Sequence, residues 1–315
     1  MIRFIACTLL LSLAACGTPS APAPTPPTPT PTTKTVNDIV LTPTQLSLPL
    51  TTFDAGPYPM HSIMVGNNIY FGNVSNSAKP QFFTRYSLSS NTFSPALAVS
   101  SNVCGCGYSS RLVSDGANIL YIANDATKYT ASAGTWTPLN YPATARDNAG
   151  EAGAGYHNGN VYFVGGRTPS TLFKYYNISQ DAWYTAPNYL YPTNMSQVSS
   201  YKDRLYVLGG TGAANKMSYF STTTSTWTAL TDTPTAVSTS YDRTLSAVVG
   251  DNLYLLQSNA VHIYDLIKNV WATTPVAISG LPGYANLFSD GQSLYVTGKN
   301  ASNVPAVFKI AVSLK

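Results

Sequence analysis

The alternation of apolar and polar residues is clearest in the stretch 159–183. An apolar run over residues 161–164 ends at the pair Gly165-Gly166, a polar loop follows, and a second run around Tyr176 comes seven residues before Trp183. Short runs of β-branched and aromatic residues bounded by Gly, Asn and Ser are typical of strands. Glycine also lets the chain turn through positive φ. The stretch therefore predicts three consecutive antiparallel strands.

This pattern recurs along most of the chain. An apolar residue followed by tyrosine occurs six times, at intervals of 41 to 51 residues, with the tyrosines at Tyr70, Tyr121, Tyr162, Tyr206, Tyr254 and Tyr295. A second series pairs aromatic residues seven positions apart: Tyr86 with Phe93, Tyr129 with Trp136, Tyr176 with Trp183, Phe220 with Trp227, and Tyr264 with Trp271. A period of about 45 residues with about four strands per unit is typical of a radial β array. The repeats predict an all-β, six-bladed propeller.

The repeats resemble the kelch family. A kelch repeat has an apolar strand with Tyr, then Gly-Gly, then a downstream Tyr and Trp. The full pattern stands at Tyr162/Gly165-Gly166/Trp183 and at Tyr206/Gly209-Gly210/Trp227. The other copies lack the glycine pair, and Phe93 replaces Trp in the first copy. The resemblance covers about residues 45–315 and implies a propeller, but it is nearly silent on chemistry because these residues pack blades.

The last repeat predicts how the ring closes. An outer-strand residue is expected seven positions after Phe308, but that position is Lys315, the last residue of the sequence. The sixth blade therefore lacks an outer strand at this end. The segment Leu46–Leu50 alternates with period two, as a half-buried strand does, and falls in phase with the outer strands. We expect it to complete the sixth blade and to protect two sheet edges. Pro49 fits such an edge strand.

The first residues resemble a bacterial lipoprotein signal. A single Arg3 precedes a short apolar core, which ends in Leu13-Ala14-Ala15-Cys16. The resemblance implies a signal peptide over 1–15 and lipidation of Cys16, with an ordinary signal peptide as the alternative. Residues 16–35 then form a Pro/Thr-rich linker, and 36–315 form the propeller. Because Gly17 follows the cysteine, the sorting rule of such lipoproteins favours the outer membrane in a two-membrane cell.

Composition narrows the partners. The chain of 315 residues carries 17 Lys+Arg against 13 Asp+Glu, a formal net charge of +4, without a basic cluster, which argues against nucleic acid. The three histidines and four cysteines have no zinc-site spacing, so no metal and no cofactor are expected. Cys104 and Cys106 are candidates for a small disulfide in an oxidising compartment, with free thiols as the alternative.

Tyrosines dominate the loops that lead into the inner strands. A propeller usually works at one mouth of its channel, where such loops meet. We expect Tyr58, Tyr108, Tyr241 and Tyr284 to contact a ligand there, because Tyr offers apolar area together with a hydroxyl. The alternative is that these rings wedge between blades as packing.

A second group of residues could support catalysis. Glu151, the only Glu in the chain, follows Arg146 before the third inner strand, while Arg111 and His61 are predicted on neighbouring inner strands. A carboxylate, an arginine and a histidine around one channel could do acid–base chemistry. The alternative is that Arg146 holds a turn and that Glu151 is solvated. We favour this alternative, because spacing in the sequence alone does not show that these side chains converge on one site.

Two functions follow from these observations. The leading hypothesis is a lipid-anchored binding or scaffold protein of the cell envelope, with a glycan, peptide or protein ligand and without catalysis. The second is a carbohydrate-active enzyme. Kelch-type sialic acid mutarotases are bacterial, six-bladed and extracytoplasmic, so the resemblance implies a sugar mutarotase acting through Glu151 with Arg146 or Arg111.

Overall fold

The computed structural model describes residues 34–48, 61–73, 82–95, 97, 99, 111–122, 126–142, 151–237, 243–300 and 305–315. All of them belong to one compact unit, Lys34–Lys315. Apart from one 3-10 turn, η1 (Val36–Asp38), every regular element in these ranges is a β-strand. Cys16, Tyr58, Cys104, Cys106, Tyr108, Arg146 and Tyr241 lie outside the described residues.

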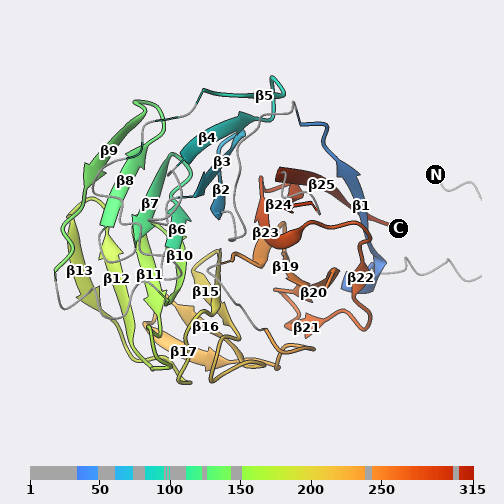
Figure 1. Cartoon of the computed structure of the whole chain (residues 1–315). Coiled ribbons are helices and arrows are strands. Elements are labelled where there is room, and N and C mark those ends of the chain that lie inside the picture. The colour runs from blue at the N-terminus through green and yellow to red at the C-terminus, as the bar shows by residue number, and fades with distance from the viewer. Residues whose placement is uncertain are drawn as a thin grey trace, which may run out of the picture. The chain divides into compact units, whose positions relative to one another are not determined.

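Six antiparallel sheets surround a common centre as the six blades of a propeller (Figure 1). Blade one holds β2 (His61–Val65), β3 (Asn68–Asn73), β4 (Phe82–Ser87) and β5 (Thr92–Phe93). Blade two holds β6 (Arg111–Ser114), β7 (Asn118–Ile122), β8 (Ala126–Thr130) and β9 (Thr135–Pro138). Blade three holds β10 (Gly153–His157), β11 (Asn160–Val164), β12 (Phe173–Asn177) and β13 (Ala182–Thr185). The propeller predicted from the repeats is confirmed.

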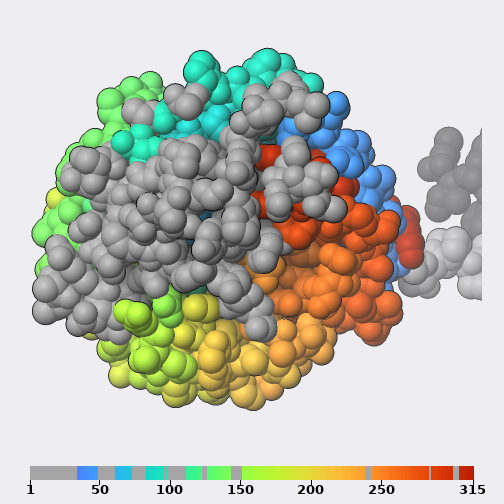
Figure 2. Space-filling model, viewed as in Figure 1, coloured from blue at the N-terminus to red at the C-terminus, as the bar shows by residue number. Residues whose placement is uncertain are grey.

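The other three blades vary the same plan. Blade four holds β14 (Gln197–Tyr201), β15 (Arg204–Leu208), β16 (Met217–Ser221) and β17 (Thr226–Ala229). Blade five holds β18 (Ser246–Val249), β19 (Asn252–Gln257), β20 (Ala260–Asp265) and β21 (Val270–Trp271), and β22 (Val276–Ala277) also pairs with β20. Blade six holds β23 (Gly283–Ser289), β24 (Ser293–Lys299), β25 (Pro305–Leu314) and β1 (Ile39–Gln45). Figure 2 shows the blades following one another around the molecule in chain order.

The sixth blade is closed by an N-terminal strand, but not by the residues expected. β1 pairs with β25 from Ile39 opposite Leu314 to Gln45 opposite Phe308, whereas the alternation had placed the strand at 46–50. Leu46 still donates its backbone N–H to Val307 O at 2.8 Å. Leu46 and Leu48 pack against a core shared by blades six and one. Their alternation therefore reflects packing between blades rather than a strand of the ladder.

The aromatic pairs seven residues apart are hairpin partners. Each pair lies directly opposite across the third and fourth strands of its blade, as Tyr176 does with Trp183 and as the other four pairs also do. The indole N–H of Trp183 donates to Asn140 O at 2.8 Å, and that of Trp227 donates to Pro187 O at 2.9 Å. Each of these tryptophans thus bonds to the chain just before its own blade and fixes one blade against the next.

Candidate functional site

The inner strands converge on a central channel. β2, β6, β10, β14, β18 and β23 contact one another in turn around the ring, so their first residues meet at one end. At that end lies a small pocket lined mostly by polar residues: His61, Ser62, Arg111, Leu112, Ala154, Ser196, Gln197, Val198, Arg243, Thr244 and Asn286. We call it the polar pocket. Residues far apart in sequence meet here because every blade contributes its inner strand to the same axis.

Hydrogen bonds fix the charged groups of the polar pocket. Arg111 is buried, and its Nε donates to Ala152 O at 2.5 Å on the neighbouring blade. Gln197 donates from Nε2 to Arg243 O at 3.0 Å and accepts the N–H of Leu245 at 2.6 Å. Asn286 Oδ1 accepts the N–H of Thr244 at 3.0 Å. The two amides therefore hold the segment 243–245 from both neighbouring blades and position the backbone of Arg243.

Glycine brings two blades close together beside the pocket. A Cβ at Gly153 would overlap Ser196 Oγ, and a Cβ at Gly155 would lie 2.6 Å from Val198 Cγ1. The hydroxyl of Ser196 is buried and makes no hydrogen bond within the described part of the chain. A buried hydroxyl without a partner loses the hydrogen bonds it had in water. Ser196 therefore offers the pocket a polar atom that a ligand or a water could satisfy.

The charged side chains among the described residues of the polar pocket belong to Arg111 and Arg243. Burial, assisted by the positive charge of Arg111, lowers the pKa of His61 to about 4, so its imidazole is neutral at pH 7. No Asp or Glu is found among the described residues that line the pocket. Arginine side chains match carboxylates and other anions, and a neutral imidazole can serve as a proton acceptor.

A wider cavity of about 360 Å³ continues along the channel. Leu112, Ala154 and Thr244 line both spaces, so the cavity adjoins the polar pocket. Its walls alternate apolar side chains with hydroxyls, including Met64, Tyr156, Phe288, Ser114, Ser199, Ser200 and Ser289. The channel thus has a charged end and a longer, uncharged part.

The structure brings two of the residues that the sequence had grouped for catalysis into one pocket. Arg111 and His61 both line the polar pocket, but Glu151 is not among its lining residues. The Glu151 carboxylate lies 4.0 Å from Arg167 Nε, and its backbone O accepts the N–H of Met195 at 2.7 Å. Tyr284 lies on β23, and only its backbone is described. The expected ring of ligand-binding tyrosines therefore stays a prediction.

Sequence reasoning missed most of the polar pocket. Gln197, Arg243, Asn286 and Ser196 were not singled out. One pattern in the sequence could have identified two of them. In its own blade, each of Gln197 and Asn286 lies opposite the residue that comes two places after the strand tyrosine, and His61 occupies the same position in blade one. Aligning the repeats by that tyrosine would have shown three polar side chains at one level of the channel. Arg243 precedes its strand and follows no such rule.

Comparison with known proteins supports the fold and does not bear on the function. No protein-family model matches the sequence, and no curated protein matches it. Among solved structures, that of YjhT superposes on this chain with a TM-score of 0.59 at 14% sequence identity. The match covers 82% of this chain and 98% of YjhT. At this identity it supports the six-bladed propeller fold and carries no residue role.

Two features that would indicate particular partners are missing from the described ranges. Within them, no three His, Cys, Asp or Glu side chains gather as a metal site. The same ranges contain no helix of the length and apolarity needed to cross a membrane.

Proposed function

We propose that this protein is a binding protein of the bacterial envelope that takes an anionic ligand, such as a carboxylate-bearing sugar or peptide, at the polar pocket. The observation that carries the proposal is the meeting of Arg111 and Arg243 with the amides of Gln197 and Asn286 in one pocket. Arginine presents paired N–H donors that match the two oxygens of a carboxylate. The amides and Ser196 supply neutral polar groups that suit sugar hydroxyls.

The predicted membrane anchor and aromatic contacts belong to this proposal. A lipid on Cys16 would hold the protein at a membrane, and the linker 16–35 would lift the propeller away from it. Tyr58, Tyr108, Tyr241 and Tyr284 would add stacking area around the ligand. Support for these parts comes from the sequence pattern.

The test is ligand binding with matched arginine variants. N-acetylneuraminate and galacturonate are titrated into the protein by calorimetry, with galactose as the neutral comparison. Arg111→Gln and Arg243→Gln should each weaken binding of the anionic sugars at least tenfold, because a hydrogen bond to a charged group contributes about 1.5–3 kcal/mol. Arg167→Gln is the control, since its side chain is 79% exposed and does not line the pocket. Equal affinity for galactose and the acids, or undiminished binding in both pocket variants, would refute the proposal.

The second candidate function is a sugar mutarotase. The observation in its favour is the neutral His61 in a pocket that can hold a carboxylate. Opening a sugar ring requires a base that takes a proton from the anomeric hydroxyl. Exchange between the anomers of N-acetylneuraminate, followed by NMR, separates the two functions. Acceleration over buffer that is lost in His61→Ala or Glu151→Gln would establish the enzyme and replace the binding function.

A further inference from the structure

A second cleft lies away from the channel, where blades three and four meet. It has a volume of about 470 Å³ and is lined by Asn160, Tyr162, Tyr175, Asn177, Gln180, Tyr184, Thr185, Ala186, Pro187, Phe220, Thr222 and Ser225. Among these described lining residues none is charged. We call it the rim cleft. Its combination of tyrosine rings with amides and hydroxyls is unlike the cationic polar pocket, so it needs a separate account.

The rim cleft presents an ordered and exposed aromatic ring. Tyr162, Tyr175 and Tyr184 lie on three neighbouring strands, β11, β12 and β13, in cross-strand register. The Tyr175 ring lies 5.3 Å from that of Tyr162, and Tyr184 stacks on Tyr175 at 5.1 Å with 19° between the rings. Tyr184 ends this row and is 39% exposed. A ligand would therefore meet a ring that is already held in place.

Sibling blades show that the fold does not require an aromatic residue at position 184. Tyr184 lies opposite Tyr175, and the equivalent positions are Thr137 opposite Lys128 in blade two and Thr228 opposite Tyr219 in blade four. Both threonines are exposed. The packing of these blades is thus complete with threonine. An exposed tyrosine in blade three adds surface that packing does not need.

In blade four, the tyrosine equivalent to Tyr175 is Tyr219, and an arginine covers its ring. The guanidinium of Arg204 lies 4.3 Å from the ring centre of Tyr219. The corresponding residue of blade three is Asn160, because both residues stand two positions before the strand tyrosine of their blade. Its short side chain accepts a hydrogen bond from Asn177 Nδ2 at 2.8 Å rather than covering a ring. An arginine therefore covers the row in blade four, whereas in blade three this position holds an asparagine and the last ring of the row, Tyr184, is exposed.

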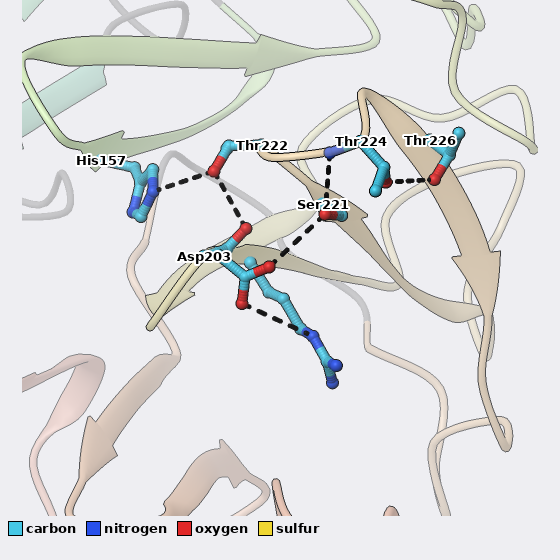
Figure 3. A network of polar contacts seen from close by, with 7 residues as sticks. His157, Asp203, Ser221, Thr222, Thr224 and Thr226 are labelled. Atoms are coloured by element: carbon cyan, nitrogen blue, oxygen red, sulfur yellow. Dashed lines mark hydrogen bonds and ion pairs between the residues drawn. The ribbon is translucent and has the colours of Figure 1, made fainter.

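Polar groups around the row are positioned for hydroxyl partners. Tyr184 donates its hydroxyl to Gln180 Oε1 at 2.7 Å, and the Gln180 N–H donates to Asn177 Oδ1 at 2.9 Å. On the opposite side, Thr222 donates to Asp203 O at 3.0 Å and lies 3.3 Å from His157 Nε2. Figure 3 shows Thr222 held between His157 and Asp203. Both walls of the cleft are fixed before any ligand arrives.

We propose that the rim cleft is a binding site for a neutral pyranose oligosaccharide. A sugar ring carries an apolar C–H face that stacks on tyrosine, and its hydroxyls pair with amide and hydroxyl groups. An anionic ligand gains nothing from a cleft without cations. A proline-rich peptide would use the aromatic area but would leave most of the amides without a partner. The site is independent of the function proposed for the channel.

The first step of the test is a glycan array that carries neutral gluco-, galacto- and manno-oligosaccharides beside acidic glycans. The full-length protein should bind at least one neutral oligosaccharide. The strongest neutral glycan is then titrated by calorimetry. Tyr184→Thr should weaken its binding at least tenfold while the melting temperature stays within about two degrees, because the sibling blades carry threonine. Tyr184→Phe keeps the ring and should retain most of the affinity.

Two control variants establish that binding occurs at the rim cleft. Thr137→Ala changes the equivalent position of blade two and should leave binding unchanged. Arg111→Gln removes a channel cation and should also leave it unchanged, so failure of the channel proposal and failure of this one give different results. The proposal is overturned if no neutral glycan binds, if Tyr184→Thr binds as tightly as the parent, or if a proline-rich peptide displaces the sugar and binds more tightly.

Discussion

At the scale of single residues, the glycines of the repeat are required by the close approach of the chain segment that enters blade four. Gly165 has φ of +79°, and a Cβ there would overlap Thr193 O. Gly210 has φ of +92°, and a Cβ there would overlap Asn194 O and Thr193 Oγ1. The segment 193–194 leads into blade four, so the glycine pairs of blades three and four both allow it to pass. A side chain would push this segment outward.

We expect Gly165→Ala to destabilise the protein by about 3 kcal/mol or more. The substitution combines left-handed strain of about 1–2 kcal/mol with an overpacking term of about 1–3 kcal/mol. Gly159→Ala is the matched control: its φ is also +79°, but nothing lies within 4 Å of the added Cβ. The control should therefore show the strain alone. Urea unfolding of both variants measures the difference, and equal losses would contradict the role given to the neighbouring blade.

His61 should make stability depend on acid. The pKa of the folded state is lowered to about 4 from an ordinary value of 6.5, so the unfolded chain takes up this proton first as the pH falls. The contribution is complete above pH 6.5 and is lost between pH 6.5 and pH 4, by up to about 3 kcal/mol. Urea unfolding at pH 7, 5.5 and 4.5 should show a steeper loss in the parent than in His61→Gln. Parallel curves would mean that folding does not lower the pKa of His61.

At the scale of elements, blade six depends on a strand from the other end of the chain. β1 pairs with β25 along its whole length, and the backbone N–H of Lys315 donates to Asp38 O at 2.8 Å. Ile39 and Leu41 point into the core between blades five and six, and the residues of β1 after Leu41 are exposed. Figure 1 shows β1 beside β25. The two ends of residues 34–315 are therefore joined in one sheet.

Leu41→Ala should lower the free energy of unfolding by about 2–4 kcal/mol, because it removes a buried side chain from a packed core. Thr42→Ala, the next residue along β1, is exposed and should change it by less than about 0.5 kcal/mol. Chemical denaturation compares the two. If the variants were equally stable, β1 would contribute little to the closure of the ring.

At the scale of the whole molecule, the propeller holds the two proposed sites at different places. The polar pocket lies where all six blades meet, and the rim cleft lies where two blades meet. Each site is lined by residues of more than one blade, so each depends on the packing between blades. The proposed lipid at Cys16 would join this carrier to a membrane through a linker.

The lipid anchor has its own test. Metabolic labelling with an alkyne fatty acid should mark the protein, because the residues up to Cys16 resemble the end of a bacterial lipoprotein signal. Cys16→Ser should remove the label and release the protein from the membrane fraction. The control is the Cys104→Ser/Cys106→Ser double variant, which should stay labelled and membrane-bound. Labelling that persists in Cys16→Ser would exclude this cysteine as the lipid site.

The sequence by itself determined the fold. Tyrosines at intervals near 45 residues and aromatic pairs seven apart reflect contacts within one blade, such as Tyr176 opposite Trp183. Contacts between residues close in sequence leave a regular signal in the chain. The closing strand was placed on the right sheet but a few residues too late, since Leu46 and Leu48 alternate for a packing reason.

The tertiary structure alone decided the sites. Arg111 and Arg243 are separated by 132 positions in the numbering and meet only because the ring brings blades two and five to one channel. The Glu151 carboxylate lies 4.0 Å from Nε of Arg167, a contact that the sequence did not predict. The row of Tyr162, Tyr175 and Tyr184 forms only because three strands of blade three pair in this register. Contacts between blades depend on how the blades are arranged around the axis. The spacing of residues within one repeat does not encode that arrangement.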